Sequence, residues 1–138
     1  MITKGLLIRL DNPPKFVRPE LLLHPNIPKP LHGCAPRVVL GPEWWHRNRL
    51  AAYVANNFCC WACGRPQMKC PQHRLEAHEC YQMNYPKGRA VLQEICALCS
   101  DCHNFIHSGR MQWMVDKREM TEKEQQRILQ RGKRLLSK

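Results

Sequence analysis

The sequence predicts a small α+β domain stabilised by metal, and three observations predict it. The chain has 138 residues, a length typical of one domain, because chains usually divide only beyond about 250 residues. It has nine cysteines, an odd number that excludes a fully paired disulfide framework. Between two Cys-x-x-Cys pairs the residues follow the order strand, turn and strand, and a short helix follows the second pair.

The charge of the chain indicates a polyanionic partner. Lys and Arg number 22 against 11 Asp and Glu, a formal net charge of +11. We expect nucleic acid first and an anionic membrane surface second. No stretch is typical of a signal peptide or a membrane span, so we expect a cytoplasmic protein that does not enter a membrane. In a reducing cytosol, clustered cysteines bind metal more often than they form disulfides.

Residues 1–42 are predicted to form an extended, proline-rich arm. Eight of the eleven prolines fall before residue 43, and proline fixes φ and removes a hydrogen-bond donor, so a regular helix is not expected. The arm could dock a protein partner, and the alternative is a partly disordered leader. Five apolar side chains could anchor the arm on a surface: Leu21, Leu22, Leu23, Ile27 and Leu31.

Residues 43–110 are predicted to form a helix followed by the cysteine and histidine domain. Gly41-Pro42-Glu43 is typical of a helix start, and the helix runs over 44–57. Strands are expected near 74–81 and 91–97, with a turn at 84–88. A helix that begins at Asp101, capped by Ser100, ends at Gly109.

Residues 111–138 are predicted to form a basic helical tail. Thr121 and Glu124 have the spacing of a capping box, which starts a helix. The apolar residues of that helix fall on one stripe: Ile128, Leu129, Leu135 and Leu136.

The two Cys-x-x-Cys pairs predict a structural zinc site. Cys60 and Cys63 form the first pair and Cys99 and Cys102 the second, with 35 residues between them. Each pair places two thiolates on one edge of a metal ion, so two pairs complete a tetrahedral zinc site. Other cysteines leave alternatives open: Cys59 could replace Cys60, and Cys70 with His73 could form half of a second zinc site with Cys80 or Cys96, or belong to an ordered loop.

A pair of histidines follows the second cysteine pair. His103 and His107 are four residues apart, on one face of the predicted helix. Two imidazoles in this arrangement can hold one divalent ion, although surface histidines at this spacing are common.

These motifs together resemble the HNH endonuclease superfamily, also called ββα-metal or His-Me finger. The resemblance rests on the first cysteine pair, on Leu-Glu-Ala-His-Glu ending at Glu79, and on residues 97–107, Ala-Leu-Cys-Ser-Asp-Cys-His-Asn-Phe-Ile-His. Residues 31–46 more loosely resemble the region that precedes these motifs in small stand-alone HNH proteins of phages and bacteria. If a phage encodes the chain, the cytosol is that of its bacterial host.

The resemblance implies a ββα-metal core and a division of roles. The four cysteines would hold structural zinc, and His78, His103 and His107 would hold a catalytic divalent cation. That cation would be Mg²⁺, although imidazole ligands also suit Zn²⁺, Ni²⁺ or Mn²⁺. Glu79 stands where the family often has a histidine base, and Glu94 where it usually has asparagine. Glu79 would therefore be the base or a further ligand, and Glu94 a second departure within the catalytic set.

The function implied is metal-dependent hydrolysis of DNA phosphodiester bonds with low sequence specificity. The alternative is a zinc-stabilised module on the same scaffold that binds nucleic acid or blocks a protein complex without cleavage. A third possibility is a subunit of a nucleic-acid-processing assembly. Seven basic side chains are candidate phosphate contacts, with plain solvated charges as the alternative: Lys87, Arg89, Arg110, Arg127, Arg131, Lys133 and Arg134.

Overall fold

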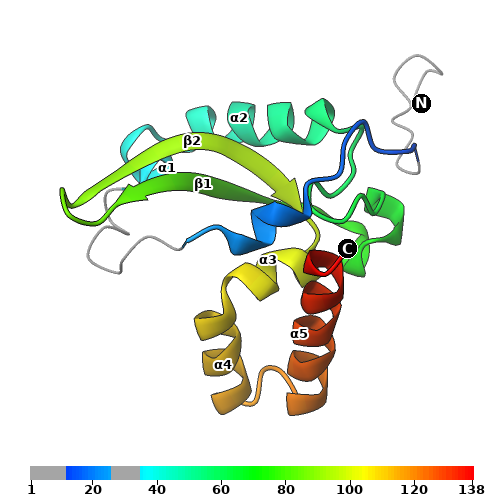
Figure 1. Ribbon diagram of the computed structural model, residues 1–138. Helices are drawn as coiled ribbons and strands as arrows, with labels where there is room; N and C mark the ends of the chain where they lie inside the picture. The colour runs from blue at the N-terminus through cyan, green and yellow to red at the C-terminus, as the bar shows by residue number, and fades with distance from the viewer. Residues whose placement is uncertain (1–11, 26–34) are drawn as a thin grey trace.

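The chain folds as a small α+β structure around a two-stranded antiparallel sheet, as predicted, in a computed structural model that describes residues 12–25 and 35–138. Strand β1 (Glu76–Asn84) turns at residues 85–88 into β2 (Arg89–Leu98). Both strands are longer than expected, because they extend to the turn. Figure 1 shows helix α2 on one side of the sheet, and the short η2 segment with helix α3 on the other.

The register of the sheet decides which side chains share a face. His78 pairs with Cys96 and Cys80 pairs with Glu94. Since side chains alternate across a strand, these four lie on the face toward η2 and α3. Glu79, one residue after His78, lies on the opposite face. A bulge between Cys80 and Tyr81 shifts the register directly after the Cys80–Glu94 pair.

The predicted helix start is confirmed, because α2 (Pro42–Ala55) begins at the proline, with Gly41 before it at a φ of 91°. Ala52 is buried against the Trp61 indole, whose nitrogen donates to the Ala52 carbonyl at 2.9 Å. A further short helix, α1 (Pro36–Val39), lies within the region predicted to be extended. The expectation of no helix there is wrong, because proline is tolerated in the first turn of a helix.

The described part of the arm packs on the domain. Segment η2 (Pro19–Leu23) is a 3₁₀ helix with Leu21 and Leu22 buried, whereas Leu23 is 69% exposed and anchors nothing. The Asn56 side chain, fully buried, accepts hydrogen bonds from the backbone of Lys15 and Phe16 at 2.8 and 3.0 Å. Residues 12–25 are therefore tied to the end of α2. Ile27, Leu31 and Cys34 lie outside the described residues.

The C-terminal third differs from its prediction in two ways. Helix α3 (Ser100–Ile106) stops at His107 (φ −93°, ψ 53°), and α4 (Ser108–Asp116) continues through Gly109, which ends no helix. The N-cap of α3 is Cys99 and not Ser100. Helix α5 (Glu122–Leu136) begins at the predicted capping box, with Thr121 Oγ1 accepting from the Glu124 backbone at 3.1 Å.

Helix α5 is part of the core and not a free tail. Figure 1 shows it running back beside α4 toward η2, and Ile128 is 2% exposed. Gly132 faces the Phe105 ring so closely that an added Cβ would lie 2.1 Å from it. Among the described residues, 3₁₀ turns also occur at η4 (Gln67–Lys69) and η5 (Pro71–His73). Within the described residues, no helix is long and apolar enough to cross a membrane.

Candidate metal centres

Four cysteine sulfurs converge where the two Cys-x-x-Cys pairs meet, and we call this group the knuckle site: Cys60, Cys63, Cys99 and Cys102. Their sulfur atoms all lie within 4.8 Å of one another, and all but Cys63 are buried. The backbone N–H of Gly64 donates to the Cys60 carbonyl at 2.9 Å, which closes the first knuckle. Four thiols in this arrangement could hold one metal ion and are compatible with structural zinc.

Hydrogen bonds within the knuckle site favour the thiolate form of two cysteines, Cys63 and Cys99. Bonds from Cys102 and Cys60 lower the pKa of Cys63 to about 6, and the pKa of Cys99 is also lowered by the neighbouring thiols. Burial raises the pKa of Cys60, and hydrogen bonds with the other three cysteines raise the pKa of Cys102. Since the thiolate is the metal ligand, the cluster holds ligands ready at neutral pH and gives up further protons when metal binds.

Arginines from two other segments compensate the charge of the knuckle site. Arg131, 14% exposed, donates from Nη1 to the Cys102 sulfur at 3.3 Å. The buried Asp101 carboxylate accepts from Arg65 at 3.1 Å and from Arg127 at 2.7 Å. A zinc ion with four thiolates has a net charge of −2, so a guanidinium on one sulfur stabilises it.

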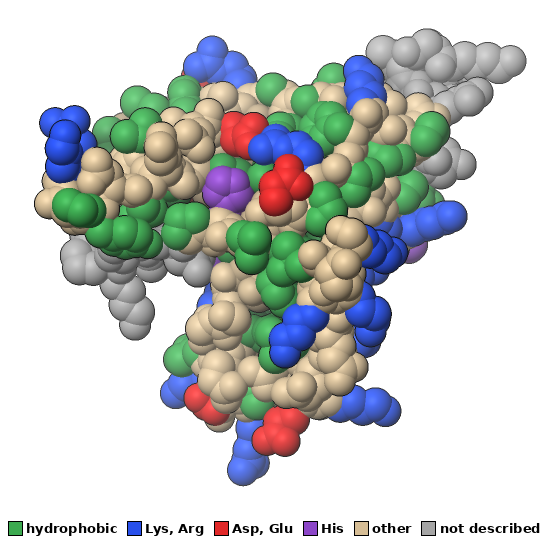
Figure 2. Space-filling view, viewed as in Figure 1, with side chains coloured by type: hydrophobic (Ala, Val, Ile, Leu, Met, Phe, Trp, Pro, Cys, Tyr) green, Lys and Arg blue, Asp and Glu red, His purple; other side chains and the backbone are tan. Residues whose placement is uncertain are grey.

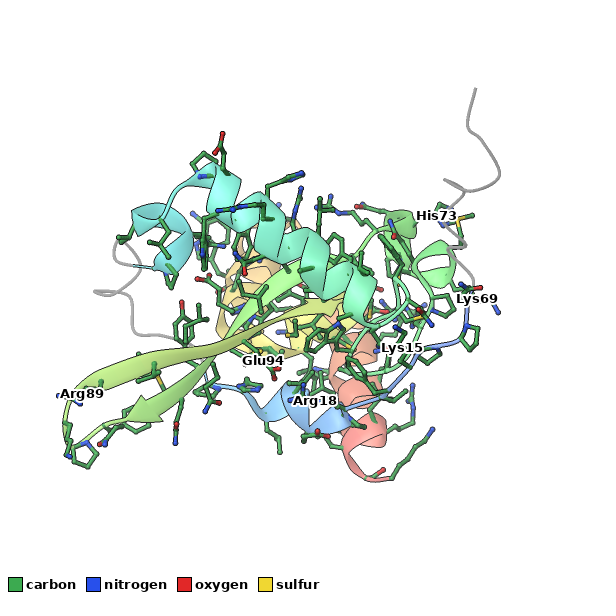
Figure 3. The ribbon with its side chains drawn as sticks, turned by 90° about the horizontal axis from the view of Figure 1, so that it is seen from above. Lys15, Arg18, Lys69, His73, Arg89 and Glu94 are labelled. Carbon is green, nitrogen blue, oxygen red and sulfur yellow. The ribbon has the colours of Figure 1, made fainter. Side chains whose placement is uncertain are left out.

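The neighbouring cysteines stay outside the four-sulfur group. The Cys59 thiol donates to the Asn12 carbonyl at 3.1 Å. Cys60, and not Cys59, belongs to the four-sulfur group, as the Cys-x-x-Cys spacing predicted. The Cys70 thiol contacts the Pro66 carbonyl at 3.3 Å. His73 is exposed, with Nδ1 2.7 Å from the Met68 carbonyl, and Figure 3 places it far from Glu94. Cys70 and His73 therefore do not share a ligand group, which favours the ordered loop.

Three histidines converge on the sheet face beside α3, and we call this group the histidine site: His78, His103 and His107. One ring nitrogen of each lies within 4.8 Å of the others, and the ring centroids are 4.7 to 5.3 Å apart. His78 comes from β1, His103 from α3, and His107 from the break between α3 and α4. The His107 backbone N–H donates to the His103 carbonyl at 3.1 Å, so the two histidines lie one helical turn apart on the same face, as their spacing predicted, and the break turns the following residues into α4.

The donor atoms of the histidine site fit a metal ion. His78 Nε2 is buried and has no hydrogen-bond partner among the described residues, an arrangement that costs free energy unless something binds it. Glu76 Oε1 lies 3.2 Å from His103 Nδ1, so it accepts that nitrogen's proton and leaves Nε2 available. A carboxylate behind a histidine in this way is the usual outer support of a metal ligand.

The electrostatics of the histidine site also suit metal binding. Burial, followed by the other histidines, lowers the pKa of His78 to about 3, and burial lowers that of His107 to about 4. Both rings are therefore neutral at pH 7, as ligands must be. The hydrogen bond with His103 lowers the pKa of Glu76, which stays charged behind it.

Glu79 lies beside this centre and outside its ligand group. Its carboxylate accepts from the Tyr81 hydroxyl at 2.9 Å and lies 3.8 Å from Arg37 Nε. Arg37 is 56% exposed, and its charge is among those that lower the pKa of His78 and His107. Arg37 therefore pairs with the Glu79 carboxylate, and its positive charge also disfavours protonation of His78 and His107.

Glu94 takes part in different contacts. Its Oε1 accepts from Arg18 Nη2 at 2.7 Å, and Figure 3 shows these two side chains pointing toward one another. Glu94 forms a ligand group with His24 and Cys80, not with the histidine site.

The predicted phosphate contacts divide into two groups. Arg127 and Arg131 are engaged with Asp101 and Cys102 as described above, so their role in the fold is structural. The other five are exposed: Lys87, Arg89, Arg110, Lys133 and Arg134. Figure 3 places Arg89 at the tip of the sheet, and Figure 2 shows Lys and Arg side chains spread around the α4–α5 end.

Comparison of the chain with models of known protein families, with curated proteins and with solved structures finds no match. The functional argument therefore rests on the geometry of the two centres.

Several residues at these centres were not among the candidates. Nothing in the sequence pointed to Glu76, Arg37 or His24, because none of them belongs to a motif with a characteristic spacing. The sequence does indicate that Asp101 needs a cationic partner, because it lies next to Cys102 and a buried charge is costly without one. It does not indicate which arginines would be the partners.

Proposed function

We propose that the protein is a metal-dependent endonuclease of the HNH type that hydrolyses DNA phosphodiester bonds. The convergence of His78, His103 and His107 nitrogens within 4.8 Å carries the proposal. Supporting it, two antiparallel strands are followed by the helix that supplies His103, which is the element order of a ββα-metal core.

The charge around the histidine site suits a phosphate substrate. Arg37 is exposed next to the histidines, and Arg110 is exposed three residues after His107. Two guanidinium groups there would bind the phosphate oxygens of a DNA strand. The sheet tip and helix α5 add exposed cations that would track the backbone without reading bases.

Each residue of the histidine site and its surroundings has a separate role in the proposed reaction. His78, His103 and His107 would hold a divalent cation, which would supply stabilisation of the negative charge on the scissile phosphate. Glu76 keeps His103 oriented, and Glu79 is the candidate base that accepts a proton from the attacking water. Glu79 can serve only if Arg37 and Tyr81 release it toward the substrate, because its carboxylate is held on the other face of β1.

Plasmid nicking tests the proposal. Supercoiled DNA is incubated with the full chain and Mg²⁺ or Mn²⁺, beside His78→Ala, His103→Ala and, as a matched control, His73→Ala on the exposed loop. We expect nicking that needs metal, is lost in the first two variants and is kept in the third. DNA binding without cleavage under every metal would refute it.

A specific observation favours the alternative, a zinc-stabilised binding module without cleavage. Both departures from the family pattern are carboxylates already engaged: Glu79 by Tyr81, and Glu94 by Arg18. Glu79→Gln separates the two functions. A base would lose roughly 10²–10⁴-fold in rate, whereas a binding module would keep its DNA affinity with no rate to lose.

A further inference from the structure

A third group of metal-ligating atoms lies next to the histidine site and plays no part in the proposed reaction. His24, Cys80 and Glu94 each offer one ligand atom, and these atoms lie within 4.8 Å of one another. His24 follows η2, Cys80 is on β1, and Glu94 faces Cys80 across the sheet. We call this group the strap site, because His24 comes from the segment that crosses the sheet.

The donor set has a definite chemistry. One imidazole, one thiol and one carboxylate are the ligand types of zinc, and a thiolate is a poor ligand for Mg²⁺ or Ca²⁺. Zinc bonds of about 2.0–2.3 Å place the ligand atoms of one ion within about 4 Å of one another. The three ligand atoms lie within 4.8 Å of one another, which is close to that spacing.

Each of the two strand ligands has an outer partner of the kind that supports metal binding. The Cys96 sulfur lies 3.2 Å from the Cys80 sulfur, and both are fully buried, so the Cys96 thiol can donate to a Cys80 thiolate. Arg18 donates to one oxygen of Glu94 at 2.7 Å, which leaves the second oxygen for an ion. Such outer hydrogen bonds orient ligands and tune their basicity.

The strap site is open on one side. The Cys80 sulfur lies at its buried end, whereas the Glu94 side chain is 33% exposed and His24 is half-buried. Two of the three ligands are therefore accessible to solvent, and three protein ligands would leave one position of a tetrahedral zinc ion for water.

We infer that His24, Cys80 and Glu94 bind a zinc-class ion, distinct from the ion of the histidine site. The His24 and His78 ring centroids are 6.5 Å apart, so the two ions would be neighbours with unlike ligands. Because His24 and the strands are far apart in sequence, the ion would also clip residues 12–25 to the sheet. The inference does not depend on nuclease activity.

Metal counting in the full reduced chain tests the inference. Native mass spectrometry after zinc addition counts the ions bound by the wild type, His24→Ala, Cys80→Ser and Cys59→Ser. Cys59 is an equally buried cysteine outside all three ligand groups, so Cys59→Ser is the matched control. We expect one zinc ion fewer in the first two variants and the wild-type number in Cys59→Ser.

Cobalt substitution identifies the ligand. Co²⁺ bound through Cys80 adds intensity to the thiolate-to-metal charge-transfer band beyond that of the knuckle site. That extra intensity should disappear in Cys80→Ser and persist in His78→Ala, because the histidine site has no sulfur. If Cys80→Ser fails to fold, His24→Ala and Glu94→Gln change the more exposed ligands and give the same readout. Equal metal counts and equal band intensity in the wild type, His24→Ala and Glu94→Gln would overturn the inference.

Discussion

The knuckle site and the histidine site lie at the two ends of helix α3, yet they are built in opposite ways. The knuckle site has four ligands from two knuckles, three of them with 1% exposure or less, and a guanidinium on one sulfur. The histidine site has three ligands, an unpartnered Nε2 and an exposed arginine nearby. A closed ligand set is typical of a structural ion, and an open one of an ion that binds substrate. Four variants test whether the two sites differ in this way.

The largest effect is expected from the knuckle site. Cys99→Ser removes one of four ligands, and a structural zinc contributes about 10–16 kcal/mol of apparent binding free energy to small metal-dependent folds. We expect loss of zinc and of cooperative unfolding, measured by metal analysis and circular dichroism. Cys59→Ser should keep both. A Cys99→Ser chain with full zinc and an unchanged melting temperature would contradict the structural role.

Gly132→Ala tests whether α5 is part of the core. The new Cβ would lie 2.1 Å from the Phe105 ring, and overpacking of this kind costs about 1–3 kcal/mol. Urea unfolding measures the loss. Gly109→Ala is the matched control, because nothing lies within 4 Å of its Cβ position in α4, and there alanine should stabilise by about 0.5–1 kcal/mol. Equal stability of the two variants would show that α5 does not pack as described.

Arg131→Met tests the support of the knuckle site from α5. The hydrogen bond to the Cys102 sulfur is lost, and loss of an outer ligand partner typically weakens metal binding 10–100-fold. Competition with a chromophoric chelator measures zinc affinity. Arg134→Met, an exposed position on the same helix, should leave it unchanged. An unchanged zinc affinity in Arg131→Met would mean that the Cys102 sulfur needs no cationic partner.

The smallest effect on metal affinity is expected at the histidine site. Glu76→Gln keeps the shape of the side chain but removes the charge behind His103, so Mn²⁺ affinity at the histidine site should fall about tenfold. Calorimetric titration measures it, with zinc at the knuckle site as the internal reference. Glu122→Gln, at an exposed position of α5, is the control. A parallel loss of zinc would indicate damage to the fold and not to the histidine site.

The local patterns of the sequence predicted much of this architecture. The cysteine pairs, the capping box at Thr121 and the start of α2 at Pro42 depend on neighbouring residues, and each appears as predicted. The convergence of His78 with His103 and His107 was expected only through the family resemblance. The break at His107 and the extension into α4 were missed, because packing of α4 against α5 overrides the glycine signal.

The four cysteines of the knuckle site and the spacing of His103 and His107 could be predicted from the sequence alone, since paired metal ligands have distinctive residue types and spacings. The grouping of His24, Cys80 and Glu94, and the partners that surround every ligand, became apparent only in the folded chain. Arg131 and Cys102 are 29 residues apart, and Arg18 and Glu94 are 76 apart; no local pattern can pair them. The physical reason is that a hydrogen bond or an ion pair depends on position in space, whereas a knuckle or a cap depends on position along the chain.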